Sequence, residues 1–255
     1  MNCQNEILKI SDGISQPKEV PFFGIDLPSL TRANTGKRAT YGSYFVRDGD
    51  RKTNPASVGI KTPIFTSSAE YAKYLEQRDE IFKDIYSARY LILGNRALEL
   101  DGITNSKQTT TNNYNHTDSQ NSFTFALANP YWQDVDFNVI SGALAAGTNN
   151  IIIETLGDAE TPFQIDLSGV NLQILSLQID SRKLSYDNET PFIVGDVLEI
   201  DTENGDTKIA GIGVENNILN GSQFPRLQPS ASNILIIEVD AVANYEIRYK
   251  NNWRL

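Results

Sequence analysis

The sequence predicts a mainly β fold, with a mixed first part and an all-β second part. Eleven Tyr and eleven Phe against a single Met favour strands over helical bundles. Only the segment at about residues 68–86 has the spacing of an amphipathic helix. The second half consists of short alternating runs separated by glycines, which is typical of an antiparallel sandwich or barrel. A chain of 255 residues accommodates two modest domains, which we place at 1–140 and 141–255, beside the small-residue stretch Ser141–Gly147.

The first 60 residues are weakly patterned. Strand-like runs are expected at Glu6–Ile10, Pro21–Ile25 and Tyr41–Val46. A basic region lies among them, and its cations are Arg32, Lys37, Arg38, Arg47, Arg51 and Lys52. This region is either a solvated loop or an electrostatic contact for an acidic neighbouring subunit.

The predicted helix at 68–86 has an apolar stripe on one face. Its members are Tyr71, Tyr74, Leu75, Phe82 and Ile85. Ser67 and Glu70 have the spacing of a capping box, which satisfies free N–H groups at a helix start. We expect the stripe to pack against a sheet and to bury Leu75 and Phe82.

A tight hairpin is expected after the helix. Ala88–Leu93 and Arg96–Leu100 flank Gly94–Asn95, a pair that supplies the positive φ of a two-residue turn. The polar run Gln108–Gln120 is then expected to be an exposed loop. After it, Ser122–Leu127 alternates large apolar residues with small or polar ones, as a half-buried strand does, and ends before Asn129–Pro130.

The second half predicts seven strands and no helix. They are expected at Val135–Ile140, Asn150–Thr155, Pro162–Leu167, Asn171–Ile179, Asp196–Ile200, Asn233–Val239 and Ala243–Lys250.

Charge and composition exclude several classes of function. A formal net charge of −10 and a pI near 4.7 argue against binding nucleic acid or an anionic membrane, since both need clustered cations. No run reaches 18 apolar residues, so no membrane insertion is expected, and the polar start of the chain does not resemble a secretory signal. The single Cys3 excludes an intramolecular disulfide and fits synthesis in a reducing compartment.

Catalytic, cofactor and metal sites are not recognisable in the sequence, and we predict none. The single Cys and the single His116 remove the usual zinc sites, haem ligation and Cys–His pairs, and His116 reads as a solvated loop residue. Asp201–Asp206 faintly resembles a calcium loop, but Asp206 stands where that loop needs glycine and Ile212 where it needs glutamate. Gly211-x-Gly213 lacks the third glycine of a dinucleotide-binding loop.

One carboxylate pair could suit a glycosidase. Glu199 and Asp201 share one face of an expected strand, and Asp196 lies on the opposite face. With 32 acidic residues in the chain, many such pairs exist, so this pair alone predicts no activity. We therefore expect a protein that is not an enzyme.

Two classes of function remain open: an assembly component and a carbohydrate-binding sandwich. Tyr131 and Trp132 either stack on a sugar or pack in a core. Phe163, Phe192 and Phe224 read as core anchors, and Tyr245 and Tyr249 share a core-like face with Ile247. Tyr186 and Trp253 are left as candidate sugar platforms, which is few for a dedicated site.

Several segments, in order, resemble the distal tail protein family of tailed bacteriophages. They are the helix with its strand pair at 68–100, the element FTFALANPY at Phe123–Tyr131, Gly195–Asp201 followed by Thr202, QFPRLQP at Gln223–Pro229 and the final strand at Tyr245–Trp253. The family usually has glycine where this chain has Ser230, so the turn there departs from the pattern. The resemblance covers about residues 60–255.

The resemblance implies a fold class and a role. The fold would be mainly β, with an N-terminal β-barrel-like domain that carries one α-helix and a C-terminal antiparallel β-sandwich of galectin-like form. The protein would be a structural virion protein made in the host cytoplasm. Its homo-hexameric ring would join the tail tube to the tail tip and its receptor-binding proteins. The alternative is a carbohydrate-binding sandwich of a phage tail or host-recognition apparatus. For the hub, Gln108–Gln120 and the basic stretch Arg32–Lys52 are the segments expected to make assembly contacts.

Overall fold

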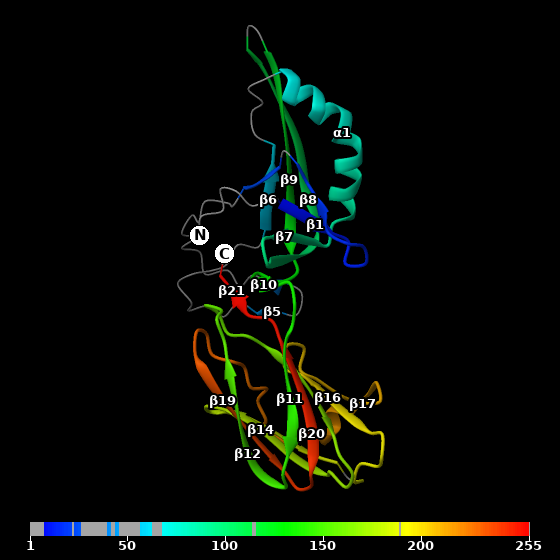
Figure 1. Cartoon of the computed structure of the whole chain (residues 1–255), viewed down its shortest axis with the longest axis vertical. Coiled ribbons are helices and arrows are strands. Elements are labelled where there is room, and N and C mark those ends of the chain that lie inside the picture. Colours follow the sequence, from blue (N-terminus) through cyan, green and yellow to red (C-terminus); the bar gives the residue numbers. More distant parts are fainter. Residues whose placement is uncertain are drawn as a thin grey trace. The chain divides into compact units, whose positions relative to one another are not determined.

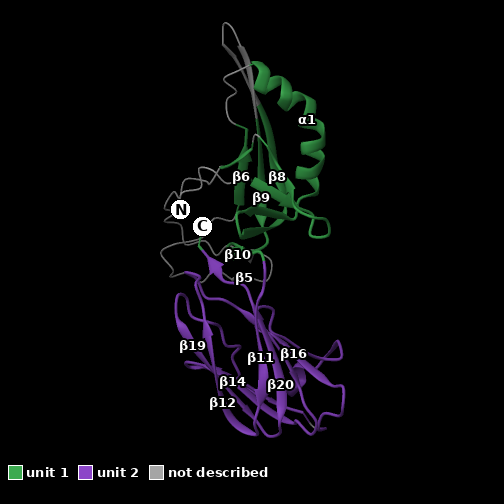
Figure 2. Cartoon of the chain, in the orientation of Figure 1, with its two compact units in different colours: residues 1–135, 254–255 green, residues 136–253 purple. Residues whose placement is uncertain are grey.

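The protein forms two compact units. A computed structural model describes residues 8–21, 23–26, 40–41, 44–45, 57–62, 68–113, 116–188 and 190–254. Unit 1 comprises residues 1–135 with 254–255, and unit 2 comprises residues 136–253 (Figure 2). The basic region, Ser67 of the expected capping box and Cys3 lie outside the described residues.

Unit 1 contains one long helix and a set of antiparallel strands (Figure 1). The helix is α1 (Ser68–Ser87). The strands are β1 (Leu8–Ser11), β2 (Lys18–Glu19), β3 (Gly24–Asp26), β4 (Thr40–Tyr41), β5 (Tyr44–Phe45), β6 (Ser57–Lys61), β7 (Tyr90–Leu93), β8 (Arg96–Asn113), β9 (His116–Leu127) and β10 (Trp132–Asp134). The helix confirms the prediction from the apolar stripe.

The main sheet of unit 1 is open in the described part of the chain. Its strand order is β2-β1-β7-β8-β9-β6-β3, and β10 also pairs with β8. The end strands β2 and β3 are only two and three residues long and pair with β1 and β6. A mainly β unit with one helix is confirmed, while these strands do not close into a barrel.

The hairpin after the helix forms as expected. Leu93 pairs with Arg96, and Gly94 takes φ 61°, which a tight two-residue turn requires. Phe123, Phe125 and Leu127 of β9 are buried, and the residues between them are half-buried. The alternating pattern of this strand is therefore confirmed.

The polar run Gln108–Gln120 was expected to be a loop, and this expectation is wrong. The strands β8 and β9 continue through it, with pairs from Gln108↔Asn121 out to Asn113↔His116. Threonine is β-branched and favours extended backbone, so three consecutive threonines sustain a strand that has no apolar pattern. His116 accordingly begins a strand.

Helix α1 is held by an aromatic cluster on the sheet. Tyr74, Ile81 and Ile85 are its buried residues. Phe82 is half-buried, with its ring edge-on to Phe123 at 5.1 Å between centroids. Leu75 is 41 % exposed, so its expected burial is wrong. The helix turns Tyr74 toward the sheet, which leaves its neighbour Leu75 at the margin of the contact.

Unit 2 is a sandwich of two antiparallel sheets. The first has the order β11-β20-β13-β16-β17-β18, and the second has the order β12-β19-β14-β15. Their bounds are β11 (Asn138–Leu144), β12 (Gly147–Glu154), β13 (Phe163–Ser168), β14 (Ile174–Ile179), β15 (Arg182–Asp187), β16 (Val197–Asp201), β17 (Asp206–Ile209), β18 (Ile212–Gly213), β19 (Ser232–Val239) and β20 (Ala243–Tyr249). A short 3-10 helix, η1 (Glu215–Asn217), and the strand β21 (Asn252–Trp253) complete it.

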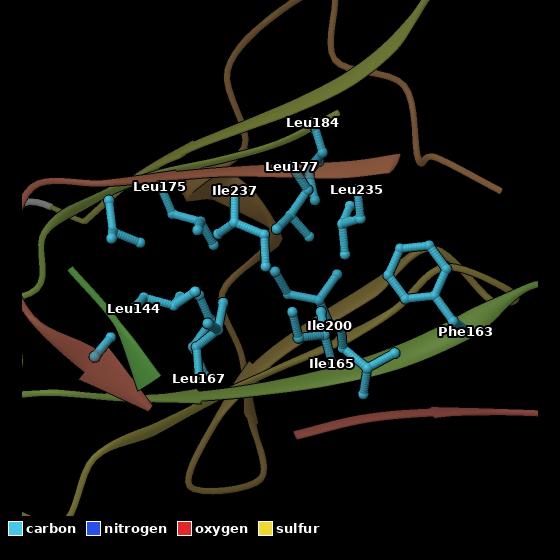
Figure 3. Close-up of a cluster of buried hydrophobic side chains, with 14 of the residues drawn as sticks. Leu144, Phe163, Ile165, Leu167, Leu175, Leu177, Leu184, Ile200, Leu235 and Ile237 are labelled. Carbon is cyan, nitrogen blue, oxygen red and sulfur yellow. The ribbon is translucent and has the colours of Figure 1, made fainter. Parts of the chain in front are cut away.

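The two sheets enclose one apolar core. Ile165, Leu167 and Ile200 of the first sheet face Leu177 and Ile237 of the second (Figure 3). Alternation places these residues inward and the polar residues between them outward. A sandwich is therefore confirmed for the second half, and each of the seven expected strands overlaps an observed one. Strands β15 and β17, rich in charged residues, were not predicted.

Candidate functional site

A small hollow lies on the outer face of the first sheet of unit 2. It has a volume of about 110 Å³ and is lined by Gln164, Asp166, Glu199, Ile200, Asp201, Asp206, Lys208 and Arg248. These residues come from β13, β16, β17 and β20, whose register places Asp166 opposite Glu199 and Gln164 opposite both Asp201 and Arg248. The sequence placed Glu199 and Asp201 on one face, and both line the hollow.

Internal contacts already use much of this charge. Arg248 Nη2 donates to Asp166 Oδ2 at 2.6 Å, and Gln164 Nε2 donates to Asp201 Oδ2 at 3.5 Å. Lys208 Nζ lies 3.4 Å from Asp206 Oδ2. Asp201 Oδ1 also accepts from the Glu203 amide at 2.8 Å. Two of these contacts cross between strands: Arg248–Asp166 joins β20 to β13, and Gln164–Asp201 joins β13 to β16.

The chemistry of the hollow is limited. Its lining offers hydrogen bonds to a small polar ligand but contains no aromatic ring for a sugar to stack on. Within the described ranges, no group of three or more His, Cys, Asp or Glu side chains could hold a metal ion. No helix in the same part of the chain is long and apolar enough to cross a membrane.

The candidate sugar platforms fare differently. Tyr186 is 1 % exposed, so it cannot stack on a ligand, and that candidate is wrong. Burial raises the pKa of the Tyr186 hydroxyl, and the hydrogen bond that it accepts from Asn217 acts in the opposite direction. Trp253 is half-buried. Strand β15 turns Tyr186 inward because its side chain has the same parity as the core residue Leu184.

The other aromatic residues mostly follow the predictions. Trp132, Phe163, Phe192 and Tyr249 are buried, and Tyr131 is half-buried. Phe224 and Tyr245 are partly buried and pack against the sandwich core. Of the unit 2 aromatic residues weighed in the sequence as core anchors or sugar platforms, only half-buried Trp253 therefore remains a candidate platform.

A second candidate site is the outer part of the long hairpin of unit 1. Strand β7 pairs with β8 only at residues 96–99, and β6 pairs with β9 only at residues 122–126. Beyond those points, β8 and β9 pair only with each other among the described strands. Register shifts at Leu100/Gly102 and Ile103/Asn105 bend the hairpin, and Gly102 takes φ 125° there. With respect to the strands that the structure describes, the outer edges are therefore open to a further strand.

Comparison with known proteins finds a family model that resembles most of unit 2. Residues 156–253 match the family model for the siphovirus-type tail component, C-terminal domain. No curated protein matches at the level of sequence.

Solved structures extend the likeness over both units. The crystal structure of SPP1 Dit (gp 19.1), a paradigm of the hub adsorption apparatus in phages that infect Gram-positive bacteria, is similar with a TM-score of 0.58. The match has 11 % identity and covers 96 % of this chain and 98 % of that one. The major capsid protein P2 of bacteriophage PM2 is weakly similar, with a TM-score of 0.27, 13 % identity and coverage of 55 % of this chain and 58 % of that one.

These matches confirm the resemblance first seen in the order of short sequence segments. The fold of nearly the whole chain is that of a Dit protein. Residues 156–253 are similar to the C-terminal domain of the siphovirus-type tail component.

Proposed function

We propose that this protein is the distal tail protein of a tailed phage, a structural hub in the virion. Six copies form a ring that joins the tail tube to the host-adhesion tip and carries its receptor-binding proteins. One observation carries the proposal: residues 156–253 match a tail-component family, and the Dit fold extends over 96 % of the chain. The proposal assigns the protein a structural role and no catalytic one.

The long hairpin supplies the ring contact. A ring needs a heterologous interface, in which one surface of a subunit binds a different surface of the next. The open edges of β8 beyond Gly102 and of β9 before Asn121 can pair with a strand of a neighbouring subunit. The sequence of the hairpin from Thr104 to Asn121 is polar apart from Tyr114, so the hairpin is compatible with water before assembly.

The ring is tested by the mass of the protein and by electron microscopy of assembled tails. Six copies of the 28.4 kDa chain form a particle of about 170 kDa, which light scattering distinguishes from a monomer. Tails that contain the chain but show no ring of it would contradict the proposal.

The hairpin contact is tested by a shortened variant. Gln108 pairs with Asn121, so Thr109–Gln120 can be replaced by Asn-Gly, which forms a tight turn between paired residues. We expect a folded protein that no longer forms rings. The folding control is circular dichroism: the spectrum of the variant should differ from that of the full chain only by the strand signal of the deleted residues. Rings formed by this variant would place the contact elsewhere.

The carbohydrate-binding alternative now has less support. Tyr186, one of its two platforms, is buried, and the charged hollow lacks an aromatic side chain. A glycan array with the full chain decides between the two functions. Reproducible binding that Trp253→Ala abolishes would favour the sugar-binding function over the pure scaffold.

A further inference from the structure

One end of the unit 2 sandwich carries an unusual concentration of exposed apolar side chains. Strand register brings four loops to this end, because Leu144 pairs with Ala243, Gly147 with Val239, and Ile174 with Asp187. The loops comprise residues 145–146, 169–173, 188–196 and 240–242. In Figure 1 this end holds the start of β12 and the start of β20.

The exposed apolar residues of these loops form what we call the end-loop surface, together with Ile174 at the start of β14. Its members and their exposed fractions are Val170 (50 %), Ile174 (53 %), Ile193 (68 %), Val194 (85 %) and Val242 (69 %). Single exposed apolar residues are ordinary on soluble proteins, whereas a group of them at one end is a candidate interaction surface.

The end-loop surface is held in place by hydrogen bonds between its loops. The Asn171 amide donates to the Phe192 carbonyl, and the Phe192 amide donates to the Leu172 carbonyl, both at 2.9 Å. Leu172 and Phe192 are themselves buried in the core. The Gln173 amide donates to Asp240 Oδ1 at 3.0 Å, which joins the loop at 169–173 to the loop at 240–242 as well. A partner therefore meets ordered loops, and binding costs little conformational entropy.

The charge around this surface has one sign. The four loops contain no Lys or Arg, and they carry Asp196 and Asp240. Asp187 is exposed at the end of β15, opposite Ile174. An adjoining hollow of about 290 Å³ is lined in part by Ile174, Leu219, Glu238 and Asp240. Its one cation, Lys183, lies 3.9 Å from Glu238, so that charge is already balanced.

We propose that the end-loop surface is the docking site for another protein of the tail, one that presents apolar side chains flanked by Lys or Arg. Apolar residues on a stiff surface provide the contact area, and the acidic rim selects a basic partner. A second copy bearing the same acidic end would bring like charges together, and an anionic membrane would be repelled. This inference rests on the proposed tail function and names the partner chemistry of unit 2.

Photo-crosslinking in assembled tails tests the docking site. A photoreactive residue replaces Val194 in the full chain, and the matched control replaces Ile152, which is 62 % exposed on the outer face of the second sheet. We expect the probe at position 194 to crosslink to a different tail protein, at a segment with apolar residues beside Lys or Arg. The probe at position 152 should give at least about tenfold less of this product.

The outcomes separate the docking site from the proposed function. Tails that lack the chain altogether would overturn the tail function and this inference with it. Tails that contain the chain but give no product at position 194, or give only a second copy or lipid, would overturn the docking site alone.

Affinity for the crosslinked protein then tests its chemistry. Val170→Ser combined with Val194→Ser should weaken binding at least about tenfold, whereas Ile152→Ser should leave it unchanged. Asp187→Lys should also weaken binding and reduce its dependence on salt, because it removes an acidic group from the rim. Circular dichroism confirms that each variant is folded. Equal affinities for the wild type and the three variants would refute the assignment of the end-loop surface as the docking site.

Discussion

A buried hydrogen bond joins helix α1 to its sheet, and one substitution removes it while keeping the aromatic ring. Tyr74 is fully buried, and its hydroxyl accepts a hydrogen bond from Asn121 Nδ2 at 2.7 Å. The backbone of Asn121 is in turn bonded to Thr62 just after β6, with the Thr62 amide 2.9 Å from the Asn121 carbonyl. The contact therefore connects the helix to β9 and β6. The variant Tyr74→Phe deletes only the hydroxyl.

At neutral pH this variant should be less stable. The ring of Phe keeps the packing against Phe23, whose centroid lies 6.4 Å away. The loss is the hydrogen bond, together with the cost of leaving the buried Asn121 amide without that acceptor. Such a deletion costs about 1–2 kcal/mol of unfolding free energy.

At alkaline pH the difference in unfolding free energy between the wild type and Tyr74→Phe should shrink and then change sign. Burial raises the pKa of Tyr74 from 10.0 to about 12, with a smaller opposing contribution from Arg78. The neutral phenol is therefore favoured in the folded protein. Its stabilising contribution is complete below pH 10, the unfolded pKa, and is lost as the pH rises through the folded pKa near 12. Two pKa units correspond to about 2–3 kcal/mol, which exceeds the expected loss at neutral pH.

Urea unfolding of the wild type and of Tyr74→Phe at a series of pH values from 7 to 12 measures this difference in unfolding free energy. The helix signal in circular dichroism reports on unit 1, since α1 is the long helix of the described chain. Subtracting one series from the other removes the titration of all other groups. A difference in unfolding free energy that stays constant across the series, or that is zero at pH 7, would refute the assigned environment of Tyr74.

Three further predictions concern packing and are checked by the same urea unfolding. Ile81→Ala, at a buried helix position, should cost about 2–4 kcal/mol, while Leu75→Ala, at a position that is 41 % exposed, should cost less than about 1 kcal/mol. Ile237→Ala should destabilise the sandwich by about 3–4 kcal/mol, whereas Ile234→Ala on the outer face of the same strand should have little effect. Gly157→Ala places a methyl group against the backbone carbonyl of Asn252 and should cost at least about 1–3 kcal/mol, whereas Gly24→Ala meets no atom within 4 Å and serves as the control. An equal loss of unfolding free energy for the two variants of any pair would contradict the burial or close contact on which that prediction rests.

The sequence predicted elements wherever local pattern and burial agree. The α1 stripe, the Gly94–Asn95 turn and the alternation of Phe123, Phe125 and Leu127 each reflect a side-chain period that matches one buried face. The hairpin beyond Gln108 was missed because both of its faces are polar, so the strand has no period to detect. Strand β15 was missed for a related reason: Arg182 and Lys183 obscure its two buried positions, Leu184 and Tyr186.

The charged hollow could be predicted only in part. Parity within one strand placed Glu199 and Asp201 on one face, as the structure does. Two other charged residues of the hollow, Asp166 and Arg248, lie 33 and 49 residues from Glu199 in sequence, and β16 pairs directly only with the strand of Asp166. Pairing between distant strands is set by topology, and a single sequence carries no signal for it.

The end-loop surface could not be predicted from the sequence either. Val170, Val194 and Val242 are each unremarkable in sequence, since one apolar residue in a glycine-containing or polar loop predicts nothing. They become a surface because an antiparallel sandwich returns every second connection to the same end. The loops are free to carry these residues because the buried anchors Leu172 and Phe192 already fix the backbone from inside. The exposed apolar side chains add nothing to the core, and the docking proposal accounts for their gathering at this one end.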